Sequence, residues 1–193
     1  MKIAILAWGS LIWNQGDLAV ARVFAPDGPR LPIEFCRISG KDVAPRRLTL
    51  VIDEAIGADC LTYSAQSALG DLDAAKENLR VREGMPNING IGFVDLSTGT
   101  ESQTAVQRHP AAVQTIRAWA EAKEYHAVIW TALDSNFSKP AAAGEAFSVE
   151  AAVRFMEARP DDERECALNY IRKAPSEVQT PVRAAVVARW PQG

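Results

Sequence analysis

The stretch AILAWGSLIW, residues 4–13, is an apolar run that is interrupted at Gly9 and Ser10 and resumes at once with Leu11. A short apolar run that enters a glycine is typical of a strand followed by a tight turn, so we expect a strand over residues 3–8. Glycine lets the backbone approach a ligand closely and expose its N–H groups. The turn could therefore hold a carboxylate or carbonyl oxygen, although a plain turn buried in a core would have the same spacing.

The spacing of glycines around this turn excludes the two common nucleotide-binding loops. A Walker loop needs four residues between two glycines and then a lysine, whereas Gly9 is followed by no glycine before Gly16 and no lysine before Lys41. A dinucleotide fingerprint needs G-x-G-x-x-G, and Leu11 stands where the second glycine should be. A ligand of this turn is therefore something other than a nucleotide phosphate.

The composition is that of an ordinary globular protein, and we expect a single domain over residues 1–193. With 48% hydrophobic and 23% charged residues, disorder is not expected. A net charge of −3 without a basic stripe gives no support for nucleic-acid binding. No apolar run approaches the roughly 18 residues that span a bilayer, and the first run is too short for a signal peptide. We expect a cytoplasmic protein that binds neither nucleic acid nor membrane; the composition defines no oligomeric state.

The three cysteines are odd in number and widely separated, which does not suit disulfides or a zinc site. Cys36, Cys60 and Cys166 are predicted to be reduced thiols in the core, because their contexts are apolar. The two histidines, His109 and His126, lie near neither a cysteine nor each other. We therefore expect no metal site.

The pattern of apolar residues predicts an α+β domain. Further strands are predicted at residues 31–39, 47–53, 60–65, 90–96 and 126–133. Helices are predicted at residues 68–83, 110–124, 148–160 and 161–174. Because the strands come in runs rather than alternating with helices, we expect a mixed or antiparallel sheet, which could be closed, rather than a Rossmann sheet.

Most carboxylates of the chain look like solvated helix charges, but Glu83 has a different context. It ends the helix predicted over residues 68–83, in RVREGM, and Gly84 follows it. A helix end that opens onto a loop is a place where a carboxylate can enter a cleft. The alternative is that Glu83 pairs with Arg80 or Arg82 as an ordinary surface charge.

Four features in order, WGSLIW, IEFCRISGKDVAPRRLTLVID, CLTYSA and a helix ending in VREG, resemble the γ-glutamylcyclotransferase family. The resemblance is closest to its glutathione-degrading ChaC-type branch, in which the first strand runs into a Tyr-Gly-Ser-Leu loop and a later Arg-Glu pair supplies the catalytic glutamate. It covers residues 1–96, about half of the chain. Past residue 100 the match fades, although ALNYIRKA, with Tyr170, is similar to a tyrosine-containing late helix of that branch.

The resemblance implies a small mixed β-barrel flanked by helices. Carried over residue by residue, it implies a substrate-binding loop at Trp8, Gly9, Ser10 and Leu11 and a catalytic residue at Glu83. Trp8 stands where the family has a tyrosine, and an indole supplies only an N–H donor in place of a phenolic hydroxyl. Any contact that the family makes through that hydroxyl, and with it the choice of substrate, is open in this chain.

The reaction that the resemblance implies needs few groups. The α-amine of a small γ-glutamyl compound attacks its own side-chain carbonyl, closes a five-membered ring and expels an amine, which leaves 5-oxoproline; glutathione would release Cys-Gly. Glu83, with a pKa raised by desolvation, would carry the proton from the attacking to the leaving nitrogen. Arg80 and Arg82 would oppose that rise, so we predict that they point away. The amides of Gly9 and Ser10 would hold the α-carboxylate, and no metal or organic cofactor is required.

Two other functions remain open. A catalytically silent relative could use the same cavity to bind an amino-acid-like ligand or a partner protein, which Trp8 and the unmatched second half of the chain motivate. A hydrolase could use the thiol of Cys166 or Cys36, although no paired base is visible in the sequence. The other large aromatic residues are predicted to be core: Trp13, Trp119, Trp130 and Trp190.

Overall fold

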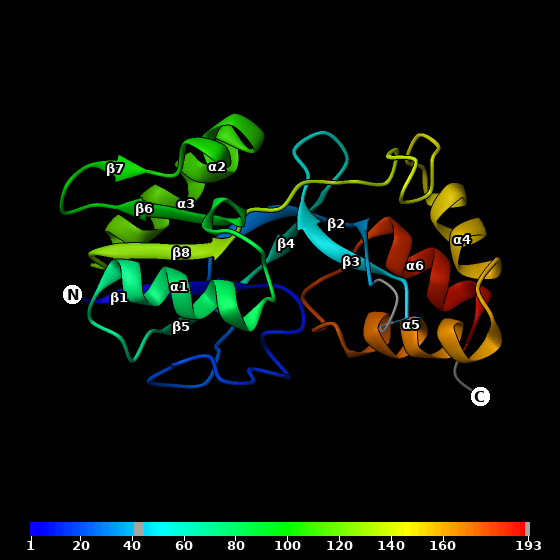
Figure 1. Cartoon of the computed structure of the whole chain (residues 1–193), viewed down its shortest axis with the longest axis horizontal. Helices are drawn as coiled ribbons and strands as arrows, with labels where there is room; N and C mark the ends of the chain where they lie inside the picture. Colours follow the sequence, from blue (N-terminus) through cyan, green and yellow to red (C-terminus); the bar gives the residue numbers. More distant parts are fainter. Residues whose placement is uncertain (41–44, 192–193) are drawn as a thin grey trace.

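The strands form two sheets in the computed structural model, which describes residues 1–40 and 45–191 (Figure 1). The larger sheet has the strand order β5-β1-β8-β6-β7, with β1 (Ile3–Ala7), β5 (Tyr63–Gln66), β6 (Ile91–Asp95), β7 (Thr100–Glu101) and β8 (Ala127–Thr131). The smaller sheet has the order β3-β2-β4, with β2 (Arg30–Ser39), β3 (Arg47–Ile52) and β4 (Ala58–Leu61). Strands β1 and β8 are parallel and the other pairs are antiparallel, so the predicted α+β domain with a mixed sheet is confirmed.

The helices form two groups. Their bounds are α1 (Leu72–Arg82), η1, a short 3-10 turn (Ile88–Gly90), α2 (Gln103–Arg108), α3 (Pro110–Ala122), α4 (Val149–Glu157), α5 (Asp161–Lys173) and α6 (Pro181–Arg189). Helices α1, α2 and α3 lie beside the larger sheet, whereas α4, α5 and α6 gather beside the smaller one (Figure 1). None of the helices within the described residues is both long and apolar enough to cross a membrane.

Strand β1 lies between β5 and β8, and this position explains why its sequence IAILA is apolar throughout. Successive side chains of a strand point to opposite faces. Ala4 and Leu6 belong to the core cluster that includes the apolar face of α3, whereas Ile3 and Ile5 belong to the cluster that includes the apolar face of α1. A strand that is buried on both faces needs a continuous apolar run rather than an alternating one.

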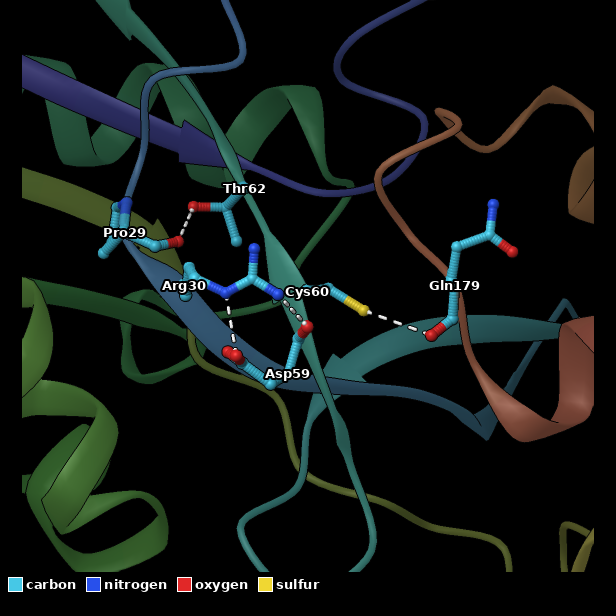
Figure 2. A network of polar contacts seen from close by, with 6 residues as sticks. All are labelled: Pro29, Arg30, Asp59, Cys60, Thr62 and Gln179. Atoms are coloured by element: carbon cyan, nitrogen blue, oxygen red, sulfur yellow. Dashed lines mark hydrogen bonds and ion pairs between the residues drawn. The ribbon is translucent and has the colours of Figure 1, made fainter.

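The chain passes from the smaller sheet to the larger one at Thr62. The sequence predicts a single strand over residues 60–65, but β4 ends before Thr62 and β5 begins after it. The buried hydroxyl of Thr62 donates to the carbonyl of Pro29 at 2.6 Å, and Arg30 pairs with Asp59 at 2.7 Å just before the crossing (Figure 2). Because the hydroxyl bond draws Thr62 toward the start of β2, the strand is interrupted there and divided between the two sheets.

The closed β-barrel that the resemblance implies is not found among the described residues, whose strands form two separate sheets. The larger sheet ends in β5 on one side and in the two-residue β7 on the other, and the smaller sheet ends in β3 and β4. A barrel requires hydrogen bonding all the way round. The break at Thr62 keeps β4 and β5 from running as one strand through both sheets.

Four elements are not predicted from the sequence. Strand β7 has two residues, η1 has three and α2 has six, and all three are too short to show a period. Helix α6 has nine residues, and the hydroxyl of Thr180 caps it by accepting from the amide of Arg183, with Pro181 in the first turn. A threonine followed by a proline is a helix start signal that could have predicted α6.

Candidate functional site

A cavity of about 1190 Å³ lies where the turn after β1, the β2–β3 hairpin, the end of α1 and one face of α5 meet. The five residues implied by the resemblance all line this cavity: Trp8, Gly9, Ser10, Leu11 and Glu83. The fold therefore brings together a turn and a helix end that lie far apart in the sequence.

The segment after β1 forms a single helical turn. The amide of Ile12 donates to the carbonyl of Gly9 at 3.0 Å, and the amide of Asn14 donates to the carbonyl of Ser10 at 2.8 Å. The first N–H groups of a helical turn have no acceptor within it. Among the described residues, nothing accepts a hydrogen bond from the amide of Gly9 or Leu11. These amides are available to an anionic group in the cavity.

Trp8 forms part of the cavity wall but offers it no hydrogen-bond donor. Its side chain is buried in the core, and its indole Nε1 donates to the carbonyl of Leu50 at 3.3 Å. Of the tryptophans predicted to be core, Trp130 is fully buried, whereas Trp13 is half-buried and lines the cavity. The indole of Trp8 therefore does not replace the phenolic hydroxyl of the family's tyrosine.

Helix α5 brings the hydroxyl of Tyr170 against the turn. A Cβ added to Gly9 would lie 3.1 Å from this hydroxyl, so the glycine leaves room for it. The ring packs edge-on against Trp13, with 5.5 Å between the centroids, and the guanidinium carbon of Arg47 lies 4.9 Å from the Tyr170 ring centroid. Burial raises the pKa of Tyr170; Arg47 opposes this rise and Glu83 adds to it. The hydroxyl therefore keeps its proton and can donate.

Glu83 caps the end of α1. Its amide donates to the carbonyl of Leu79 at 3.0 Å, and Gly84 follows with a φ of +63°, a left-handed conformation that suits glycine and ends the helix. The Glu83 side chain is only 21% exposed. Burial raises the pKa of Glu83, and Arg82 opposes that rise. The carboxylate is thus partly desolvated at the wall of the cavity.

The prediction that both flanking arginines point away from Glu83 is right for Arg80 and wrong for Arg82. Arg80 pairs with Glu77 at 2.6 Å on the exposed side of α1. Arg82 donates from Nη1 to a carboxylate oxygen of Glu83 and from Nη2 to the carbonyl of Asn14. The turn after β1 presents this carbonyl next to the end of α1, and one guanidinium has enough donors to bind both groups.

The β2–β3 hairpin supplies four cavity residues that are not among the site residues predicted from the sequence. The antiparallel register places all four on one face of the hairpin. They are Arg37, Ser39, Arg47 and Thr49. The signal that could have found them is the polar residue at every second position of CRIS and RLTL, in strands that are otherwise apolar.

The prediction of buried thiols holds for two of the three cysteines. Cys36 and Cys60 are buried, whereas Cys166 is exposed and lines the cavity, because it lies on the polar side of α5. Burial raises the pKa of Cys36 to about 12, and the nearby Asp53 carboxylate contributes. The Cys60 thiol donates to the carbonyl of Gln179 at 3.7 Å (Figure 2). Neither buried thiol is suited to act as a nucleophile.

Neither histidine is among the residues that line the cavity. The amide of Lys2 donates to His126 Nδ1 at 2.8 Å, and His109 is buried between α2 and α3, where burial lowers its pKa. Within the part of the chain that the structure describes, no group of three or more His, Cys, Asp or Glu residues could hold a metal ion.

Comparison with known proteins adds no assignment to this cavity. No protein-family model, curated protein or solved structure matches the chain. The function must therefore be inferred from the residues of the cavity itself.

Proposed function

We propose that the protein is a γ-glutamylcyclotransferase, which releases 5-oxoproline and an amine or peptide from a small γ-glutamyl compound. One observation carries the proposal: Glu83, the turn at Gly9 and Ser10, and the Tyr170 hydroxyl lie together in one cavity. The reaction needs a group that holds the substrate, a group that moves protons and a donor for the carbonyl oxygen. These three elements supply one group each.

The turn after β1 holds the α-carboxylate of the γ-glutamyl group. The open amides of Gly9 and Leu11 are suited to an anion, and the start of a helical turn favours negative charge. Because the attack is intramolecular, holding the substrate in a folded conformation supplies a large part of the acceleration. The buried side chain of Trp8 forms the cavity wall next to these amides and limits the size of the substrate that fits.

Glu83 moves the protons. It takes one from the α-ammonium group, which frees the nitrogen to attack the γ-carbonyl carbon, and it donates to the leaving nitrogen as the C–N bond breaks. Over the whole reaction two protons leave the attacking nitrogen and two arrive on the leaving nitrogen, so neither water nor a net proton is consumed. The raised pKa of Glu83 brings its basicity closer to neutral pH, and such transfer contributes roughly 10²–10⁴-fold in rate.

Tyr170 stabilises the oxygen of the tetrahedral intermediate. Burial keeps the Tyr170 hydroxyl protonated. The side-chain hydroxyl and the backbone amide of Ser10 are both within hydrogen-bonding reach of it. A donor that is fixed in place before the reaction is worth more in a partly desolvated cavity than in water. Trp13, packed edge-on against the ring, holds the hydroxyl in position.

The test is release of 5-oxoproline from glutathione and from a panel of γ-glutamyl amino acids and amines. Wild type is compared with Glu83→Gln and with Glu77→Gln, which removes an exposed carboxylate from the same helix outside the cavity. We expect Glu83→Gln to lower kcat by at least about 10²-fold and Glu77→Gln to retain wild-type activity. Equal activity of Glu83→Gln and wild type, with both folded, would contradict the role of Glu83.

A catalytically silent, ligand-binding relative is the second candidate, and the ion pair between Arg82 and Glu83 favours it. A guanidinium that is hydrogen-bonded to the carboxylate weakens it as a base. This function predicts that γ-glutamyl compounds raise the melting temperature without turnover. No 5-oxoproline from any panel member, together with such a shift, would select it over the enzyme.

A further inference from the structure

The polar face of the β2–β3 hairpin lines the same cavity but takes no part in the steps above. Across the two strands Arg37 pairs with Thr49, and Ser39 pairs with Arg47. The two hydroxyls of this set bind each other, with 2.9 Å between the Oγ atom of Ser39 and the Oγ1 atom of Thr49. The two arginines are the groups that a ligand could engage.

Both arginines have a buried nitrogen without an acceptor. The Nε atoms of Arg37 and Arg47 are inaccessible, and no described residue accepts a hydrogen bond from either. Other parts of each side chain are held in place: Arg37 Nη1 donates to the carbonyl of Asp134 at 2.7 Å, and Arg47 lies over the ring of Tyr170. A ligand in the cavity cannot reach these inaccessible Nε atoms. Both side chains nevertheless line the cavity, and neither forms an ion pair with a carboxylate of the described residues. This points to a ligand that accepts from the Nη nitrogens of both arginines.

The guanidinium group determines the class of that ligand. Its Nη nitrogens carry several N–H donors in one plane, which suit the oxygens of a carboxylate. Among the residues that the structure describes, no carboxylate is ion-paired with Arg37 or Arg47: Glu83 is bound by Arg82, and the Asp134 carboxylate lies 3.8 Å from Arg108. The acceptor is therefore expected to come from the substrate.

The position of Tyr170 indicates where this anion would lie relative to the γ-glutamyl group. Its hydroxyl lies beside Gly9, at the turn that holds the γ-glutamyl α-carboxylate, whereas Arg47 lies over its ring. The two anion-binding positions are thus separated by one tyrosine ring. A ligand that fills both carries two negative groups, and a cavity of about 1190 Å³ is large enough for a dipeptide or tripeptide.

We infer that Arg37 and Arg47 bind the carboxylate of the departing amino acid or peptide, so that the substrates are γ-glutamyl amino acids and peptides with a free carboxyl terminus rather than γ-glutamyl amines. The identity of the leaving group rests on the proposed function, whereas the anion site rests on the two arginines. The carboxylate makes and breaks no bond. It orients the leaving nitrogen toward Glu83, and both arginines are specificity-determining residues.

The experiment compares γ-glutamylglycine with γ-glutamylglycinamide, which has the same size but lacks the second negative charge. The ratio of kcat/KM for the two compounds is measured for wild type, Arg37→Met, Arg47→Met and Arg46→Met. Arg46 is the matched control, because it neighbours Arg47 but donates to the carbonyls of Ala141 and Ala142 and does not line the cavity. Because each ratio is taken on one protein sample, any loss of folded protein cancels.

We expect wild type and Arg46→Met to prefer the carboxylate by about 10- to 100-fold, the range for a charged pair of hydrogen bonds. In Arg37→Met and Arg47→Met the ratio should fall toward one. Equal use of both compounds by wild type would overturn the inference, as would an equal loss on both compounds in Arg47→Met, which would place Arg47 on the γ-glutamyl α-carboxylate.

Binding separates this inference from the proposed reaction. In the Glu83→Gln background, calorimetry gives the Kd values of the two compounds with Arg47 and with Arg47→Met. One outcome is that wild type forms no 5-oxoproline, whereas Glu83→Gln binds the carboxylate form more tightly and loses this preference with Arg47→Met. This outcome would contradict the proposed reaction but support the anion site. Failure of Glu83→Gln to bind either compound, or equal binding of both, would overturn the anion site.

Discussion

Glu34→Ala is expected to loosen the attachment of α6 to the smaller sheet. Glu34 is only 1% exposed on β2, and its carboxylate accepts from the amide of Phe35 at 2.6 Å and from the amide of Val182, in the first turn of α6, at 3.4 Å. The hydroxyl of Thr180, the residue that caps α6, also bonds to it. Within the described residues, the Glu34 carboxylate is thus the only side-chain group of β2 that is hydrogen-bonded to the start of α6.

The size of the expected destabilisation follows from the hydrogen-bond donors that Glu34→Ala leaves without an acceptor. Two buried backbone N–H groups, of Phe35 and Val182, would lose their acceptor, at about 1–3 kcal/mol each. The hydroxyl of Thr180 can rotate toward another acceptor and is not counted. We expect the free energy of unfolding to fall by about 2–6 kcal/mol, a large fraction of the roughly 5–15 kcal/mol that stabilises a typical domain.

The assay is urea unfolding of wild type, Glu34→Ala and the exposed control Glu121→Ala at several pH values. Burial raises the pKa of Glu34 above its ordinary value of 4.5, so the folded state binds this proton more tightly than the unfolded state. The contribution of Glu34 to stability is therefore complete below pH 4.5 and declines as the pH rises through the folded-state pKa. The stability difference between wild type and Glu34→Ala should be larger near pH 4.5 than at about pH 8.

Two results would refute this reasoning. One is a difference between wild type and Glu34→Ala no larger than the roughly 0.5 kcal/mol expected for a surface change such as Glu121→Ala. The other is a difference that grows as the pH rises, which would mean that the ionised form of Glu34 is the one that stabilises the fold.

Three further outcomes are expected. Arg82→Met removes the group that lowers the pKa of Glu83, so the acid limb of the pH profile of kcat/KM should move to higher pH; an unmoved limb would show that Glu83 is not the titrating base. Gly92→Ala places a Cβ 2.4 Å from the Trp130 ring, and urea unfolding should show a loss of about 1–3 kcal/mol, whereas an unchanged midpoint would contradict the close packing. Ellman's reagent should titrate one thiol, Cys166, in the folded protein and all three after unfolding; a second fast thiol would contradict the burial of the other two.

Local patterns in the sequence predict the main strands well. The bounds of β1, β2, β3, β6 and β8 lie within two residues of the predicted ones, because apolar runs between turn residues are fixed by burial and backbone conformation. The same signals fail at Thr62, where a hydrogen bond to a residue far away in sequence divides one apolar run between two sheets. Cys166 shows the same limit, since its sequence context does not say which side of α5 meets the core.

The candidate site likewise has some features that the sequence predicts and others that it does not. The sequence by itself determined that a tight turn follows the first strand at Gly9 and Ser10 and that Glu83 stands at a helix end, because both depend on residues within a few positions. Only the tertiary structure decided that Arg82 binds Glu83 and that Tyr170 reaches the turn. The tertiary structure also decided that Arg37 and Arg47 of the β2–β3 hairpin face the cavity. These arrangements depend on which faces of distant segments meet, and that is set by the packing of the whole chain rather than by neighbouring residues.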